Sequence, residues 1–160
     1  MSSYVVNKCI LGILDAIDRG VSTEEIRKNP TQYMISGKTK EIVINSGGEG
    51  LKLSPEIIEE MANRGDDVAK DILVKDKFRT YSNSSLKFAY LEDEMCNPIR
   101  DNPILIEIIK ESKLKNTGGM DLVIYQVPVE DWAFKIREEK DFWGCEYIDS
   151  YIQGTCKIVK

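Results

Sequence analysis

The fold is decided first by residues 122–127, which read LVIYQV. This run is rich in β-branched and aromatic side chains, a composition typical of a strand. Outward from it, residues 132–136 alternate apolar with polar side chains, and residues 147–152 and 156–159 suggest one or two closing strands. The earlier run IVI at residues 42–44 adds another strand. The chain is therefore expected to build a mainly antiparallel sheet, most of it from the later half.

Helical signals dominate the first part of the chain. Apolar residues recur at helical spacing from Tyr4 to Arg19, which predicts an amphipathic helix that ends at Gly20. Ser22 or Thr23 can cap a second short helix, which ends near Pro30. We expect residues 1–30 to form an N-terminal helical arm.

Two later helices begin with a polar cap followed by proline. Ser54 precedes Pro55, and either Asp101 or Asn102 precedes Pro103. Proline is favoured at the first helical position, because the amide proton it lacks would have no partner there. Residues 66–75 predict one more short helix.

The segment between the arm and the first strand is ambiguous. Residues 32–35 look extended, with residues 36–39 (SGKT) as a hairpin turn, although residues 32–35 could instead be helical. With residues 80–85 expected as a polar loop, residues 31–160 are predicted to form one compact α+β domain, its helices on one side of the sheet.

Composition excludes several functions. The chain has 160 residues, a formal net charge of −5 and no histidine. Mechanisms that need imidazole as base or metal ligand are therefore excluded, and the acidic balance argues against general DNA binding. Four cysteines are too scattered for a zinc knuckle, so neither a metal nor a cofactor is predicted.

The same sequence indicates where the protein works. No signal peptide is recognisable at the start of the chain, and no apolar run is long enough to cross a bilayer. Scattered cysteines are typical of reduced thiols in a cytosol-like compartment. A cytoplasmic location without membrane association is expected.

Four short motifs follow one another along the chain: Gly48–Ser54 (GEGLKLS), Asp101–Glu107 (DNPILIE) preceded by Arg100, Val127-Pro128, and Asp141–Glu146 (DFWGCE). In this order they resemble a family of small uncharacterised proteins of large DNA viruses, including giant amoebal viruses, and of tailed phages. The resemblance covers roughly residues 40–151, with residues 66–97 as an insertion. It implies a viral setting, in the host cytoplasm or the virion, and no particular reaction.

The glycine-rich loop is the first ligand-binding candidate. Gly47, Gly48 and Gly50 lie between a strand and a helix, where glycines let a phosphate approach the backbone. However, Leu53 stands where the fingerprint has its third glycine, and Pro55 removes one amide donor from the helix start. A structural turn is therefore the preferred interpretation.

A charged pair and a set of aromatic residues complete the candidates. Arg100 and Asp101 could bind a ligand at the start of the second proline-led helix, although Asp beside a helix start is also ordinary capping. Large aromatic residues occur in interfaces and in cores alike, and the candidates for an interface are Trp132, Phe142, Trp143 and Tyr147.

Two functions stay open on this sequence. The preferred one is a non-catalytic binding or regulatory module. Its partner is a protein, and a second copy of the chain would suit, because the apolar stripe of the arm needs a partner if the body does not cover it. The alternative is a histidine-independent enzyme, or a binder of a nucleotide or phosphorylated small molecule at the loop of Gly47 to Gly50.

Overall fold

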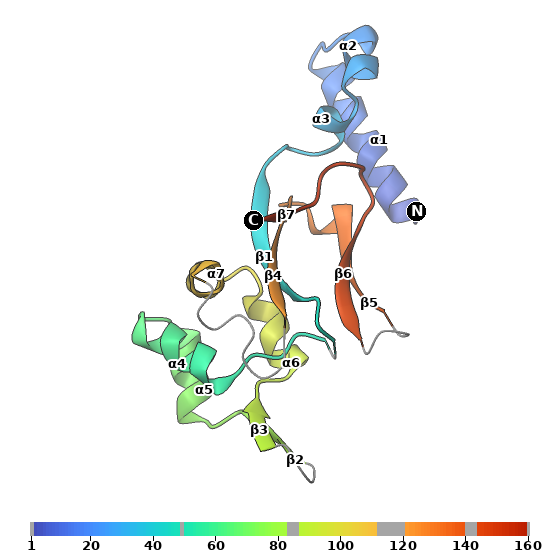
Figure 1. Cartoon of the computed structure of the whole chain (residues 1–160). Helices are drawn as coiled ribbons and strands as arrows, with labels where there is room; N and C mark the ends of the chain where they lie inside the picture. Colours follow the sequence, from blue (N-terminus) through green and yellow to red (C-terminus); the bar gives the residue numbers. More distant parts are fainter. Residues whose placement is uncertain (1, 49, 83–86, 112–120, 140–143, 160) are drawn as a thin grey trace. The chain divides into compact units, whose positions relative to one another are not determined.

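The protein has an α+β fold, as the sequence predicts, in a computed structural model (Figure 1). The structure describes residues 2–48, 50–82, 87–111, 121–139 and 144–159. The strands divide among three small sheets, with orders β1-β4-β7, β2-β3 and β5-β6, in place of the one sheet expected. The chain also divides into two compact units.

Unit 1 comprises residues 1–40, 126–136 and 148–157. Its helical elements are α1 (Ser3–Asp18), α2 (Thr23–Lys28), α3 (Thr31–Met34) and the 3-10 turn η3 (Asp131–Ala133). Ser2 and Ser22 accept hydrogen bonds from the first turns of α1 and α2, so both predicted helices of the arm are confirmed. The arm belongs to a unit that also contains two later segments of the chain.

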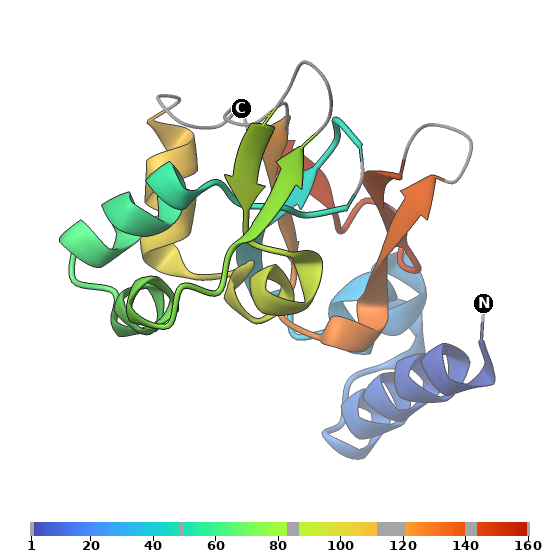
Figure 2. The same ribbon diagram turned by 90° about the horizontal axis from the view of Figure 1, so that it is seen from below.

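Unit 2 comprises residues 41–125, 137–147 and 158–160. It contains α4 (Pro55–Asn63), α5 (Asp67–Val74), β2 (Arg79–Ser82), β3 (Lys87–Tyr90), α6 (Asp93–Cys96), the 3-10 turn η1 (Asn97–Ile99) and α7 (Pro103–Lys110). The capped starts at Ser54 and Asn102 are confirmed, each with proline at the start of its helix. Figure 2 shows β2 and β3 side by side, as an antiparallel pair.

The remaining strands are shared between the units. They are β1 (Thr39–Asn45), β4 (Leu122–Pro128), β5 (Phe134–Glu139), β6 (Cys145–Ser150) and β7 (Lys157–Val159). Each of the five unit boundaries falls inside one of these strands. Backbone hydrogen bonds from Ser46 to Asp121 and from Val129 to Lys38 show that β1 and β4 run antiparallel.

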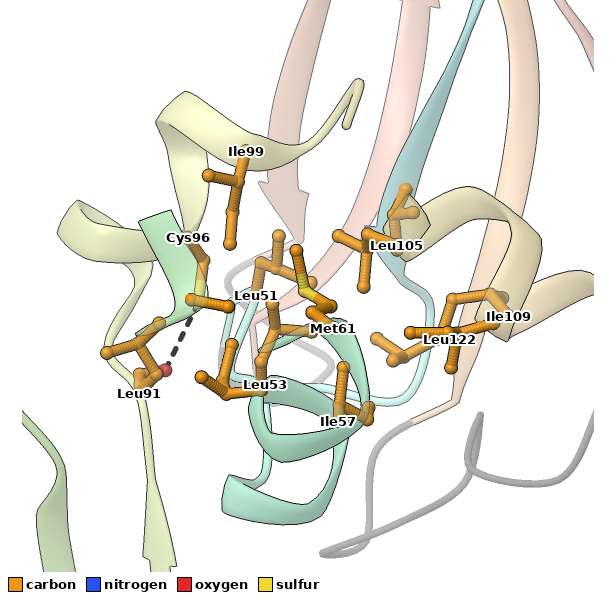
Figure 3. Close-up of a cluster of buried hydrophobic side chains, with 14 of the residues drawn as sticks. Leu51, Leu53, Ile57, Met61, Leu91, Cys96, Ile99, Leu105, Ile109 and Leu122 are labelled. Carbon is orange, nitrogen blue, oxygen red and sulfur yellow. Dashed lines mark hydrogen bonds between the residues drawn. The ribbon is translucent and has the colours of Figure 1, made fainter. Parts of the chain in front are cut away.

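The main apolar cluster lies in unit 2. Figure 3 shows side chains from α4 and α7 meeting those of the segment after β1, among them Leu51, Met61 and Leu105, all fully buried. Helices α4 and α7 contribute because proline and a cap fix where each starts, which sets which side chains point inward. The cluster gives unit 2 its own core.

Of the two alternatives for residues 32–35, the helical one is confirmed, since α3 covers residues 31–34. The hairpin turn expected at residues 36–39 was wrong, because residues 36–38 lead from α3 directly into β1. Arg79–Ser82 is strand β2 where a polar loop was expected, because its backbone pairs with β3 although its side chains are exposed. Residues 116–119 (NTGG), whose composition predicts a turn, lie outside the described residues.

Candidate functional site

Asn45, at the end of β1, organises the glycine-rich loop. Its Nδ2 donates to the carbonyl oxygens of Gly48 and Gly50, each at 2.7 Å. Its Oδ1 accepts from the amides of Gly47 at 3.0 Å and Asp121 at 3.1 Å. An amide side chain has two donor hydrogens and two acceptor lone pairs, so the fully buried Asn45 is completely satisfied.

Carboxylates surround this loop. Gly50 has a φ of +69°, and a Cβ added there would lie 2.8 Å from Asp93 Oδ2 and 2.9 Å from Glu138 Oε1. Glycine is therefore required both by its backbone angle and by the closeness of these side chains. Two carboxylates so close to the backbone disfavour a bound phosphate, so the surroundings support the structural turn over a ligand site at Gly47, Gly48 and Gly50.

Arg100 is buried in an ion pair. Its Nη2 lies 2.6 Å from Glu146 Oε2, and its Nη1 donates to Glu146 Oε1 and to the carbonyl of Val43, both at 3.0 Å. Its Nε donates to Asn97 Oδ1 at 2.8 Å. Only 9% of the Arg100 side chain and 2% of the Glu146 side chain are exposed. The guanidinium therefore holds β1, η1 and β6 of unit 2 together.

The cap next to Arg100 is Asn102, while Asp101 is exposed. Asn102 Oδ1 accepts from the amides of Ile104 and Leu105, and its Nδ2 donates to Asp66 Oδ2 at 2.7 Å. Asp66 itself caps α5, since its Oδ1 accepts from the amide of Ala69 at 2.7 Å. The starts of α5 and α7 are thus joined by one hydrogen bond between their caps.

The aromatic candidates do not form a described cluster. Trp132 is half-buried in η3 of unit 1, and Tyr147 is 40% exposed on β6 in unit 2. Phe142 and Trp143 lie outside the described residues. The interface role of all four stays a prediction.

Helix α1 has two different apolar faces. One face packs on α3, where Val5 and Ala16 are buried and Gly12 approaches the backbone of Tyr33 and Met34. The other face is exposed, with exposed fractions of 41% for Val6, 47% for Ile10, 49% for Leu14 and 43% for Ile17. These four residues follow one another at intervals of about one helical turn, so they form a continuous stripe, the α1 stripe.

Metal and thiol chemistry have little support in the described residues. Cys9, Cys96 and Cys156 are free thiols, and within the described ranges no three Cys, Asp or Glu side chains are grouped to hold a metal ion. Burial raises the pKa of the Cys96 thiol to about 12, which disfavours the reactive thiolate. In the part of the chain that the structure describes, no helix has both the length and the apolar character to cross a membrane.

The sequence missed Asn45 and Glu146 as organising residues. Asn45 had a local signal, because asparagine before Ser-Gly-Gly is typical of a side chain that bonds the backbone two residues ahead. Glu146 had no such local signal, since its partners Arg100 and Asn45 are distant in sequence.

Comparisons with protein-family models, with curated proteins and with solved structures each returned no match.

Proposed function

We propose that this chain is a non-catalytic protein-binding module in which the α1 stripe binds the α1 stripe of a second copy. The observation that carries the proposal is the exposure of Val6, Ile10, Leu14 and Ile17 along one helix face. Adjacent exposed apolar side chains favour association, because burying them removes apolar surface from water.

The spacing of the stripe supports a helix as the partner. Val6, Ile10, Leu14 and Ile17 are separated by four, four and three residues, the spacing at which side chains share one helix face and can pack on a second helix. An antiparallel pair sets Val6 against Ile17 and Ile10 against Leu14 of the other copy. The same pairing is then repeated by the two-fold axis, as a symmetric dimer requires.

Charge favours the antiparallel arrangement. The first half of α1 carries Lys8, whereas the second half carries Asp15 and Asp18 ahead of Arg19. An antiparallel pair brings the basic half of each helix beside the acidic half of the other and also opposes the two helix dipoles. A parallel pair would place like halves together.

The expected dimer is weak. Two helices of 16 residues, each about 24 Å long, form a small interface, and interfaces under about 1,200 Å² belong to transient complexes. We therefore expect a monomer–dimer equilibrium that depends on protein concentration, which sedimentation equilibrium measures directly.

Substitution tests the stripe. The double variant I10E/L14E is expected to remain monomeric at every concentration, because dimerisation would bury four like charges. Val74→Glu is the matched control, since Val74 is 84% exposed on α5 and the change also replaces an exposed apolar side chain by a charge. A monomeric native protein, or a dimer unaffected by I10E/L14E while circular dichroism is unchanged, would reject the proposal.

Cysteine pairs test the register. In a background with Cys9→Ser, Cys145→Ser and Cys156→Ser, the double variant V6C/I17C is expected to form intermolecular disulfides on mild oxidation, whereas V6C alone is not. Disulfide formation by V6C alone would instead identify a parallel pair.

The viral or phage setting suggested by the short motifs would suit such a module and stays a prediction.

A further inference from the structure

A pocket with a volume of about 570 Å³ lies within unit 1. Its lining comes from three stretches of the chain, which lie at residues 28–39, 126–128 and 154–157. Small-molecule sites commonly have volumes of about 300–1,000 Å³, so the pocket can take a metabolite-sized ligand. All its lining residues belong to unit 1, so the pocket is complete within one unit.

The charge of the pocket is opposite to that of the chain. Three lysines line it, namely Lys28, Lys38 and Lys157, and no aspartate or glutamate is among the described residues of the lining. In a chain with 27 acidic and 22 basic residues, this is a local reversal of charge. Such a concentration of positive charge raises the local concentration of anions.

The lysines are available to a ligand. Among the residues that the structure describes, neither Lys38 nor Lys157 forms a salt bridge. Lys28 lies 3.6 Å from Glu24, with both side chains more than half exposed, and such a pair is weak in water. Three ammonium groups therefore remain to bind an anion.

Two carboxylates close in sequence to the lining residue Pro128 each have a partner outside the lining, although Glu130 Oε2 is buried without a hydrogen-bond partner. Glu130 accepts a hydrogen bond from the amide of Ser36 at 2.8 Å, and Asp131 lies 2.7 Å from the ammonium of Lys40. Burial alone would raise the pKa of Glu130, but the hydrogen bonds from Ser36 and from its own backbone outweigh it and lower that pKa. Glu130 is thus charged at neutral pH and held at the Ser36 backbone.

The other lining residues define the rest of the ligand. Thr31, Gln32 and Asn29 provide hydroxyl and amide groups, and Pro30, Ile35 and Pro128 provide apolar surface. Lysines bind phosphate as point charges, whereas polar and apolar groups together suit a sugar or ring. We propose that this pocket, the unit 1 pocket, binds a phosphorylated small molecule with a carbon skeleton of sugar size.

The SGKT segment now has a physical explanation. Gly37, Lys38 and Thr39 all line the pocket, and Gly37 has a φ of +77°, which glycine adopts without strain. The segment continues into strand β1, whereas a phosphate-binding loop of the nucleotide-hydrolase type continues into a helix. Charge from lysine side chains, rather than a helix start, is therefore the recognition element.

Calorimetric titration tests the proposal with inorganic phosphate, pyrophosphate, glucose 6-phosphate and glucose. We expect saturable binding of glucose 6-phosphate, weaker binding of inorganic phosphate and none of glucose. Lys38→Gln and Lys157→Gln should each weaken glucose 6-phosphate binding about tenfold, the effect of losing one charge-assisted contact. Lys135→Gln is the matched control, because Lys135 is an exposed lysine on β5 that does not line the pocket.

Two results would overturn the proposal. One is the absence of saturable binding by any of the three phosphate compounds up to about 10 mM. The other is binding that Lys135→Gln weakens as much as Lys38→Gln does, which would mean nonspecific attraction. Thermal melting without ligand confirms that each variant is folded, and the dimerisation experiments above do not affect the outcome.

Discussion

Arg100 and Glu146 show at the scale of single residues how a sequence motif can mislead. An arginine next to a helix start looked like a ligand-binding group, but its charge is neutralised by a buried carboxylate from a segment 46 residues away. The sequence contains both residues and no local pattern that pairs them. Their contact follows from the tertiary fold, which brings β6 next to η1 within unit 2.

The Arg100–Glu146 pair gives a stability prediction. Arg100→Met should lower the free energy of unfolding by about 3–5 kcal/mol, because it removes the countercharge of the buried Glu146 and leaves that side chain only the hydrogen bond from the Asn45 amide. The double variant R100M/E146L should recover much of this loss, because neither charge remains. Urea denaturation measures both values. Near-native stability of Arg100→Met would show that Arg100 is not structural and would revive it as a ligand-binding residue.

Cys96 gives a pH prediction. Its pKa is raised to about 12 by burial, above the value of 9.0 for a free thiol. Because the pKa of Cys96 is higher in the folded state, the protonated thiol stabilises the folded protein. This contribution to the free energy of unfolding is fully present below pH 9 and is lost as the pH rises from 9 towards 12. Iodoacetamide at pH 8.5 should thus modify Cys96 last, at the rate of unfolding, and peptide mass spectrometry reads this out.

The other cysteines are the internal control for this labelling. Cys9, Cys145 and Cys156 are half-buried, so they should react before Cys96 does. Labelling of Cys96 as fast as Cys156 in the folded protein would contradict its burial. In 6 M urea all four should react at similar rates.

At the scale of elements, contact between α1 and α3 depends on a missing side chain. A Cβ on Gly12 would overlap the carbonyl oxygen of Tyr33 and lie 3.0 Å from that of Met34. Both obstacles are backbone atoms, so they cannot rotate away. Gly12→Ala should therefore destabilise unit 1 by about 1–3 kcal/mol through overpacking, although alanine favours helices.

The control for Gly12→Ala is Gly20→Ala. An added Cβ at Gly20 meets no atom within 4 Å, but its φ of +87° strains any other residue. The destabilisation by Gly20→Ala thus measures the cost of backbone strain alone, without the steric clash that Gly12→Ala introduces. Hydrogen exchange should show lost protection in α3 for Gly12→Ala alone, and equal effects of the two variants on α3 would argue against close packing at Gly12.

The linked caps of α5 and α7 give a coupling prediction. Asn102→Ala should destabilise by about 1–2 kcal/mol as a lost cap, and Asp66→Ala by a similar amount. Asn102 also donates a hydrogen bond to Asp66, and each single variant removes this bond. The sum of the two single-variant destabilisations should therefore exceed the destabilisation of the double variant by at least about 0.5 kcal/mol. Strict additivity in a double-mutant cycle would mean that the hydrogen bond between the caps contributes nothing.

The elements that the sequence predicted well are those with local signals. Ser54 with Pro55, and Asn102 with Pro103, mark helix starts through groups only a few residues apart. Strand β2 was missed because its exposed side chains do not alternate between apolar and polar. It is a strand only because its backbone pairs with β3, from Arg79 opposite Tyr90 to Ser82 opposite Lys87. Helix α6 was not predicted from the sequence; it has only four residues, and its cap residue Glu92 makes no side-chain hydrogen bond to the first turn.

The candidate site was less predictable than the fold for the same reason. The α1 stripe could be found from spacing, because it depends on one helix alone. The unit 1 pocket could not, since Lys38 and Lys157 line one pocket only when residues 28–39 and 154–157 come together. A positively charged pocket in an acidic chain cannot be predicted from the sequence, because it depends on where the fold places the lysines.

At the scale of the whole molecule, the predicted boundary after residue 30 can be tested by truncation. Deletion of residues 1–30 removes Val5, Ala16 and Ile26, which are buried apolar residues of unit 1. The melting temperature should fall by at least about 5 °C, since each kcal/mol shifts a protein of this size by about 2–4 °C. An unchanged melting temperature would mean that residues 1–30 are an independent arm.

The strands that pass through both units also determine the order in which parts of the chain can fold during synthesis. Unit 1 starts with residues 1–40, yet its next segment begins only at residue 126. At about 5–20 residues per second, a ribosome takes roughly 4–17 s to reach that segment. Helices α1 to α3 can form at once, but β1 must wait for β4, with its apolar side chains exposed meanwhile. A nascent chain of this kind is a natural substrate for a ribosome-associated chaperone, and its yield should depend on translation speed between residues 40 and 126.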